Sequence, residues 1–257
     1  MLFLPEEALA PNVFCFTTSV QGGVSDDAYK SFNLAMHVQD NEHRVATNRQ
    51  LLHAIIVQQA LNISTSAKLP LIAPIKWLNQ QHSNVISDYD SAISPTSNAA
   101  CDAIYSTRIN TPLAVMTADC LPIIIACTKS GQIAAIHAGW RGLLNGVLNE
   151  TVTKFSDKTS LTVWIGPSIS PAHFHISDDI IAQFSNYKDA ILPAATAGKY
   201  HVDLAQIARK LLADLKVPTI QKSPICTYSS EYCFSHRRAS HQGLQQTGRM
   251  ATVVLRV

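Results

Sequence analysis

The sequence has 257 residues, of which 47% are hydrophobic and 15% are charged, and its formal net charge is +2. A chain of this length can bury a large core, and the small net charge without a long Lys or Arg run argues against nucleic-acid or membrane partners. The first residues lack the basic start and apolar stretch of a signal peptide, and no apolar run is long enough to span a bilayer. We therefore expect a cytoplasmic protein whose six cysteines are thiols.

Strands and helices are predicted from apolar runs and from helical spacing of apolar residues. In chain order, we expect a strand at 13–17, a helix at 42–61, strands at 72–78, 113–116, 123–126 and 133–136, helices at 144–155 and 204–215, and a strand at 252–255. Trp77 and Trp164 are expected in strands. No linker-like stretch divides the chain, so these elements predict one α/β domain over residues 1–257, with its sheet covered on both faces.

Three potential metal ligands, His82, Cys120 and His137, each stand just after a predicted strand. Open sheets place their binding sites at such strand ends. Two imidazoles and one thiolate suit zinc, and three protein ligands leave a fourth tetrahedral position for water or substrate. The pattern therefore predicts a catalytic metal site, although the spacing of these residues is no chelate motif.

The same residues permit other interpretations. Cys120 and His137 could be buried core side chains. Alternatively, Cys120 could be a nucleophile with His137 as its base, as in cysteine hydrolases. Asp119 could orient a ligand or transfer a proton, or it could be a turn residue. The sequence alone leaves these alternatives open.

Arginines at two places could bind an anion. Arg141 stands between two glycines at a predicted helix start, where free N–H groups favour negative charge. Arg237, Arg238 and Arg249 lie in a stretch near the C-terminus that has little predicted secondary structure. Each arginine could equally be a solvated surface residue. The alternative is that the arginines bind a phosphate-bearing substrate or inorganic phosphate.

The remaining histidines and cysteines give weaker signals. His173 and His175 form a His-x-His pair, but nearby prolines predict a loop at the periphery of the site. The other five cysteines have no nearby candidate partners, so we expect them to pack in the core. They are Cys15, Cys101, Cys127, Cys226 and Cys233.

An ordered series of short motifs extends over nearly the whole chain. The series comprises Phe16-Thr17-Thr18, Gly22-Gly23-Val24-Ser25, Asn33-Leu34, Asn48-Arg49, Trp77-Leu78-Asn79-Gln80-Gln81-His82, Thr117-Ala118-Asp119-Cys120-Leu121-Pro122, His137-Ala138-Gly139-Trp140-Arg141-Gly142, Ile165-Gly166-Pro167, His201-Val202-Asp203-Leu204, Cys226-Thr227-Tyr228, Phe234-Ser235-His236-Arg237-Arg238 and Thr247-Gly248-Arg249. Together these motifs resemble the laccase-domain, YfiH-like family, whose members are variously called polyphenol oxidase, purine nucleoside phosphorylase and peptidoglycan editing factor. Ser83, His175 and His236 depart from the family's usual glycine, acidic residue and aromatic residue.

The resemblance implies an α/β (α+β) fold with a large mixed β-sheet flanked by helices, and a zinc ion held by His82, Cys120 and His137. It favours phosphorolysis of adenosine, inosine and methylthioadenosine, with adenosine deamination beside it, so the expected partners are a purine nucleoside and inorganic phosphate. The expected catalytic residues are Asp119, Cys120 and Arg141. The expected substrate-binding residues are Asn33, Arg49, Arg141, Arg237, Arg238 and Arg249.

Three alternatives to this function stay open. The first is hydrolysis of a wrong amino acid from a UDP-linked muropeptide, an editing reaction on a cell-wall precursor. The second is phenol oxidation with copper, which has less support because one ligand trio plus the His-x-His pair is a small set for several copper ions. The third is a non-enzymatic protein with a structural zinc.

Overall fold

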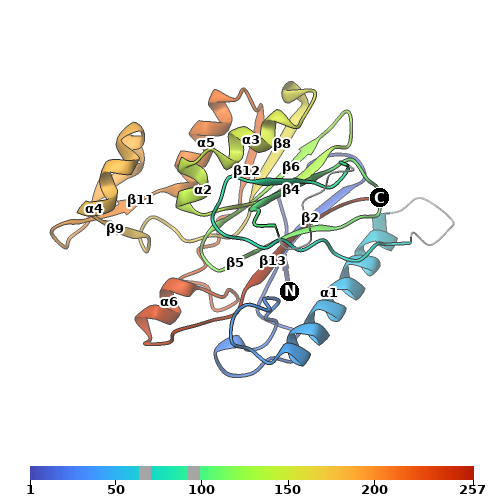
Figure 1. Ribbon diagram of the computed structural model, residues 1–257, viewed down its shortest axis with the longest axis horizontal. Helices are drawn as coiled ribbons and strands as arrows, with labels where there is room; N and C mark the ends of the chain where they lie inside the picture. Colours follow the sequence, from blue (N-terminus) through green and yellow to red (C-terminus); the bar gives the residue numbers. More distant parts are fainter. Residues whose placement is uncertain (64–70, 92–98) are drawn as a thin grey trace.

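The computed structural model of the chain describes residues 1–63, 71–91 and 99–257. Two β-sheets stack face to face, and helices cover the outer face of each sheet (Figure 1). The expected α/β class, with a large mixed sheet flanked by helices, is confirmed. None of the helices in the described part of the chain has the length and apolar character needed to cross a membrane.

The larger sheet has the strand order β12-β8-β6-β7-β4-β3. Two of its neighbouring pairs, β3 with β4 and β8 with β12, are parallel, and the other pairs are antiparallel, so the sheet is mixed. Its strands are β3 (Ile86–Asp88), β4 (Ala103–Ser106), β6 (Leu121–Cys127), β7 (Ile133–Ala138), β8 (Leu161–Ile165) and β12 (Thr219–Lys222).

The smaller sheet is antiparallel and has the order β1-β2-β13-β5. Its strands are β1 (Leu2–Phe3), β2 (Val13–Thr18), β5 (Leu113–Thr117) and β13 (Met250–Arg256). A separate three-stranded sheet, with the order β10-β11-β9, lies beside the main body (Figure 1). It consists of β9 (His175–Ser177), β10 (Ile191–Pro193) and β11 (Lys199–Val202).

Helices cover the two sheets from opposite sides. The α-helices are α1 (Glu42–Ile63), α2 (Trp140–Leu144), α3 (Val147–Thr153), α4 (Asp178–Ile181), α5 (Leu204–Asp214) and α6 (His236–His241). Three short 3-10 helices are η1 (Asp27–Tyr29), η2 (Lys158–Ser160) and η3 (Ala182–Ala190). Helix α1 packs on the smaller sheet, and α2, α3 and α5 pack on the larger one.

Alternation along the strands explains this layering. In β6, Ile123 and Ile125 face the helices, whereas Ile124 and Ala126 face the smaller sheet. Every residue of β6 is buried, because both faces of the sheet are covered. In β7, Ile133 and Ala135 also point between the sheets, so the period of two places His137 on that side, at the end of the strand.

Two predicted elements were wrong. Residues 72–78 form no strand, because Pro74 offers no N–H and the segment pairs only through isolated bridges at Lys76 and Asn79. Trp77 therefore does not lie in a strand. The predicted helix over 144–155 is split into α2 and α3 at Gly146, whose φ of 88° is left-handed. The other predicted helices and strands are present, several of them longer than predicted.

The six cysteines are thiols, as predicted. Cys15, Cys101, Cys127 and Cys233 are buried, in agreement with a packing role. Cys226 differs, because it is half-buried and its Sγ accepts a hydrogen bond from the backbone N–H of Ser170.

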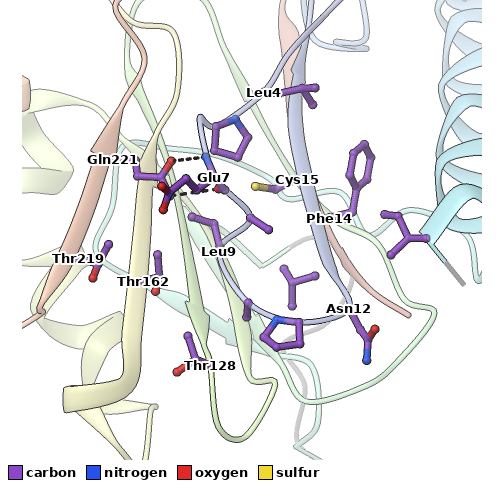
Figure 2. A pocket seen from close by; sticks show the side chains of 16 residues that line it. Leu4, Glu7, Leu9, Asn12, Phe14, Cys15, Thr128, Thr162, Thr219 and Gln221 are labelled. Carbon is purple, nitrogen blue, oxygen red and sulfur yellow. Dashed lines mark hydrogen bonds between the residues drawn. The ribbon is translucent and has the colours of Figure 1, made fainter. Parts of the chain in front are cut away.

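The N-terminal segment runs past the two sheets at one end of β6, opposite to the end at which Leu121 begins the strand. There the backbone N–H and carbonyl of Glu7 bond to the side chain of Gln221 in β12 (Figure 2). These groups border a cavity of about 750 Å³ that also contacts Thr128 and Thr162, which lie at or near the far ends of β6 and β8. The cavity is thus at the opposite end of β6 from Cys120.

Candidate metal centre

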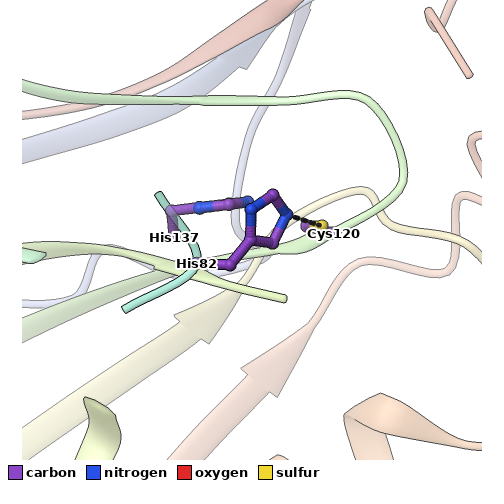
Figure 3. A group of neighbouring side chains, drawn as sticks. All are labelled: His82, Cys120 and His137. Atoms are coloured by element: carbon purple, nitrogen blue, oxygen red, sulfur yellow. Dashed lines mark hydrogen bonds between the residues drawn. The ribbon is translucent and has the colours of Figure 1, made fainter. Parts of the chain in front are cut away.

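His82, Cys120 and His137 converge where the two sheets meet (Figure 3). Cys120 closes the turn between β5 and β6, and it precedes Leu121, which pairs with Ala138 of β7. One ligand atom from each side chain of the trio lies within 4.8 Å of the other two. The three residues are therefore neighbours in the fold, although the strand predicted before His82 is absent.

The spacing of these atoms fits a tetrahedral metal ion. Cys120 Sγ lies 3.7 Å from His82 Nε2. At the tetrahedral angle, an ion bound at about 2.3 Å from sulfur and about 2.0 Å from nitrogen would hold the two donors about 3.5 Å apart. The trio thus fits zinc in both donor type and geometry, with one coordination position left for a further ligand.

A fully buried carboxylate, Asp102, organises two of the ligands. His137 Nδ1 donates to its Oδ1 at 2.7 Å, which leaves His137 Nε2 to face the centre. The backbone N–H groups of Gln81, His82 and Ser83 donate to the same carboxylate at 3.1, 3.0 and 2.6 Å, and the Ser83 hydroxyl donates at 2.7 Å. This carboxylate therefore fixes both the His137 ring and the loop on which His82 sits.

The pKa values of Asp102, Cys120 and His137 are all shifted from their ordinary values. Burial opposes ionisation of Asp102, but hydrogen bonds from His137, Ser83 and Gln81 outweigh it and lower the pKa of Asp102 to about 2. Burial likewise opposes the charged forms of Cys120 and His137, yet their mutual attraction lowers the pKa of Cys120 to about 6 and raises the pKa of His137 to about 9. The thiolate form that a metal or a nucleophilic mechanism needs is thus favoured.

Gly139 leaves room for the centre. A Cβ at this position would lie 2.6 Å from His82 Cδ2 and 3.2 Å from Cys120 Sγ. Its backbone, with φ −69° and ψ 166°, is one that any residue can adopt. The glycine is therefore required by the close approach of the ligands and not by its own conformation.

We expect Asp102→Asn to weaken zinc binding about 10- to 100-fold, because an amide cannot accept the same set of hydrogen bonds and no longer orients His137 as a carboxylate does. Competition with a chromogenic chelator at fixed pH would measure the affinity. Asp157→Asn is the matched control, since Asp157 caps a turn through Thr159 and Ser160. Wild-type affinity in the Asp102 variant would contradict the orienting role.

The trio opens into a cavity of about 340 Å³. The other side chains that line it are His37, Gln80, Met116, Thr117, Ala118, Arg141, His236 and Arg249. Among these residues there is no Asp or Glu. Gln80 fastens the His82 loop to β5, because its amide donates to the carbonyl of Met116 and accepts from the N–H of Met116, both at 2.8 Å.

Two of the predicted anion-binding arginines line this cavity. Arg141 lies in the first turn of α2 with its guanidinium carbon 4.2 Å from the Trp140 ring centroid. Arg249 comes just before β13, and its Nη1 donates to the carbonyls of Thr247 and Gly248 at 2.7 and 3.2 Å. Arg141 and one of the three C-terminal arginines thus line the cavity of the trio, as expected from the sequence.

Arg237 and Arg238 bind protein carbonyls. Arg238 donates to the carbonyls of four residues in the preceding loop, and these are Thr227, Tyr228, Ser230 and Cys233. Arg237 donates to the carbonyls of His173 and His175. The structure therefore uses both guanidinium groups to hold loops together beside the cavity.

Asn33 and Arg49 also make internal contacts. The Asn33 amide donates to Asp40 at 2.8 Å, and its Oδ1 accepts from the backbone N–H of Arg249 at 2.9 Å. Arg49 donates to the carbonyl of Leu34 at 2.9 Å and stacks on Trp77 with its guanidinium carbon 4.1 Å from the ring centroid. Neither residue is among those that line the cavity, but Asn33 holds the backbone of Arg249, which does line it.

Asp119, next to Cys120, is buried and has a left-handed φ of 101°. Its carboxylate accepts from the Thr227 hydroxyl at 2.6 Å and from the backbone N–H of Arg237 at 2.7 Å. It therefore joins the Cys120 turn to α6.

His175 begins β9, contrary to the loop predicted there, because it pairs with His201 of β11. His173 lies in the preceding turn, where its ring stacks on Tyr228 and its Nε2 lies 3.0 Å from Ser229 Oγ. The pair thus belongs to the edge of the three-stranded sheet, away from the residues that line the cavity.

Comparison with known proteins places the chain in a family. Residues 14–257 match the profile of a family described as multi-copper polyphenol oxidoreductase laccase. A Haemophilus influenzae protein named purine nucleoside phosphorylase is 38% identical and covers 97% of each chain. The Escherichia coli protein named purine nucleoside phosphorylase YfiH is also 38% identical, over 93% of this chain and 92% of its own.

Solved structures show the same fold. A Neisseria meningitidis protein of the family DUF152 superposes with a TM-score of 0.83 at 31% identity, over 99% of this chain and 98% of its own. The Bacillus licheniformis protein YfiH superposes with a TM-score of 0.81 at 26% identity, over 94% and 92%. The matched profile and the similar relatives extend over nearly the entire sequence, and the chain therefore belongs to the multi-copper polyphenol oxidoreductase laccase family, which includes the YfiH-like proteins.

Proposed function

We propose that this protein is a zinc-dependent purine nucleoside phosphorylase that acts on adenosine, inosine and methylthioadenosine and also deaminates adenosine. The observation that carries the proposal is a three-ligand centre that opens into a cavity lined by Arg141 and Arg249 and, among the described residues, by no carboxylate. Such a cavity suits a reaction between a neutral nucleoside and an anion. The names of the similar Haemophilus influenzae and Escherichia coli proteins support the substrate class.

The residues divide into holders of the metal and holders of the substrate. His82, Cys120 and His137 would bind zinc, which when present supplies a Lewis acid able to activate water or polarise an oxygen. Arg141 and Arg249 would hold phosphate beside the ribose. In phosphorolysis, a phosphate oxygen forms a bond to the anomeric carbon as the C–N bond breaks, and the purine leaves with that electron pair and takes up a proton.

Asp119 fits a positioning role in this scheme. Both oxygens of its carboxylate are engaged, one with Thr227 and the other with the N–H of Arg237. It would therefore hold the Cys120 turn against α6 and act on catalysis through that turn.

The test is incubation of zinc-loaded protein with adenosine, with and without inorganic phosphate, followed by separation of adenine, inosine and hypoxanthine. We expect adenine and ribose 1-phosphate only when phosphate is present, and inosine in both samples. Splitting of adenosine at the same rate without phosphate would refute phosphorolysis.

Arg141→Ala should raise the KM for phosphate about 10-fold or more and change the KM for adenosine much less, because charge-assisted contacts act on the anion. Deamination, which uses water, should be affected less than phosphorolysis. Metal content should stay unchanged. Initial rates at varied phosphate and adenosine concentrations measure this, with Arg44→Ala as the control because Arg44 pairs with Asp26 at the surface. An equal loss in both reactions would contradict the assignment of Arg141.

The low pKa of Cys120 beside His137 favours one second candidate, an editing hydrolase that removes a wrong amino acid from a UDP-linked muropeptide. In that case Cys120 would attack the amide carbonyl and form a thioester, His137 would protonate the leaving amine, and water would then hydrolyse the thioester to a carboxylate and free Cys120. The discriminating result is hydrolysis of such a precursor by metal-free protein. Copper-dependent phenol oxidation has weaker support, since the described residues hold a single group of three ligands of this kind.

A further inference from the structure

Two histidines that the proposed function leaves without a role face the cavity from separate segments. His37 lies in the stretch before α1, and His236 is the first residue of α6. Both residues are exposed, and Arg249, which is only partly exposed, lines the same cavity. Partial burial and the nearby charge of Arg249 lower the pKa of each imidazole. Each ring carries an N–H group that can donate to a ligand in the cavity.

Arg249 is held in place by the protein around it. Its backbone N–H donates to Asn33, and its guanidinium is tied to the carbonyl of Thr247. Gly248, the residue before it, lies against the Phe234 ring so closely that a Cβ would come within 2.5 Å of that ring. The guanidinium of Arg249, which lines the cavity, is thus held in place, which is an advantage for binding a ligand of fixed shape.

The charge of Arg249 is not matched by a carboxylate. Within the described part of the chain it forms no ion pair with Asp or Glu. Burial lowers its pKa, and Cys120 and Asp119 are the main groups that oppose this effect. Zinc would neutralise the Cys120 thiolate, and Asp119 is already engaged with Thr227. A partly buried guanidinium in this position is stabilised by an anion from solution.

We propose that Arg249, His37 and His236 together form the subsite for a tetrahedral oxyanion, with Arg141 contributing from α2. The guanidinium supplies two parallel donors and the imidazoles supply one donor each, which matches the several acceptor oxygens of such an anion. The identity of the anion as inorganic phosphate rests on the proposed function. His37 and His236 are then binding residues for the anion, because each adds one N–H donor for an acceptor oxygen.

The experiment measures binding of inorganic phosphate to zinc-loaded protein without nucleoside, by isothermal titration calorimetry. We expect His37→Phe and His236→Phe each to raise the Kd for phosphate about 10-fold, as for loss of one hydrogen bond to a charged group. Arg249→Met should raise it about 30-fold or more. His236→Gln, which retains an N–H donor, should recover much of the affinity lost in His236→Phe.

Matched controls lie outside the cavity. Arg256→Met changes the arginine at the other end of β13, where it bonds to the carbonyl of Thr107. His43→Phe changes an exposed histidine in the first turn of α1. Both controls should bind phosphate with wild-type affinity, and all variants should keep their zinc. Because His37 and His236 are exposed, their variants should fold even if Arg249→Met does not.

The outcomes separate this subsite from the proposed function. Weakened phosphate binding in the His37 and His236 variants supports the subsite, even if the wild-type protein then splits no nucleoside and the proposed function fails. Unchanged phosphate affinity in both histidine variants overturns the subsite, even if the wild-type protein is an active phosphorylase. Absence of measurable phosphate binding to the wild-type protein overturns it as well.

Discussion

Cys120→Ala is expected to remove the bound metal and both proposed activities together, while the protein stays folded. Cys120 supplies the one thiolate of the trio, and the two remaining imidazoles form a much weaker zinc site. The folded core does not depend on this side chain, because it is contributed by residues between the sheets and under the helices. We expect kcat/KM for adenosine to fall by on the order of 10³-fold.

Metal analysis, circular dichroism and turnover of the same preparation would check this expectation. Cys226→Ala is the matched control, since Cys226 is a half-buried thiol that is not part of the trio. Retained zinc with lost activity would favour Cys120 as a nucleophile. Loss of the fold together with the metal would favour a structural zinc, because a closed structural site contributes directly to folding.

Elements with strong and uninterrupted patterns were predictable from the sequence. Helix α5 keeps an apolar stripe along its whole length, and Leu204, Ile207, Ala208 and Leu212 all enter the core that the stripe predicts. Strand β13 is a run of apolar and β-branched residues, six of which are buried. In both cases the local preference and the tertiary environment agree, so the pattern was sufficient to predict the element.

Elements that depend on single residues or on distant partners were not predictable in the same way. Pro74 prevents the 72–78 segment from joining a ladder, although its apolar residues favour a strand. Gly146 ends one helix and allows another to begin within what looks like one apolar stripe. The small sheet of β9, β10 and β11 has only two buried residues, Ile176 and Val202, and its strands are too short for a clear alternation.

Cys120 and His137 stand at adjoining ends of the paired strands β6 and β7, which the sequence predicted. His82 follows no strand, so its place in the trio was implied by the family resemblance. The residues that support the trio were not predictable. Asp102 resembles any other aspartate in the sequence, since its partners His82 and His137 lie far from it along the chain. His37 offers no local signal at all, because the fold of the chain before α1 decides which way it faces. Contacts between remote segments carry this information, and a single sequence does not display them.

Gly139→Ala is expected to lower zinc affinity by about 10²-fold or more, although it adds one methyl group. The new Cβ would lie 2.6 Å from His82 Cδ2 and 3.2 Å from Cys120 Sγ, so His82 would have to leave its place beside Cys120. The backbone at Gly139 suits alanine, so the substitution should not strain the chain itself. The variant therefore tests whether the close approach of these two side chains is needed for the metal.

Gly142→Ala is the matched control for Gly139→Ala, because it adds the same methyl group one turn later in α2. Its Cβ would lie 3.1 Å from the carbonyl of Ser83, 3.6 Å from Val147 and 3.8 Å from the backbone carbonyl of His137, and none of these atoms is a ligand atom of the trio. We expect the control to bind zinc within a few-fold of wild type, since the Ser83 loop needs to give way by only a few tenths of an ångström. Chelator competition on both variants measures the contrast. Equal zinc affinity in the two variants would mean that His82 is not held against Cys120 in the metal-bound protein, and the proposed three-ligand centre would then lose its geometric basis.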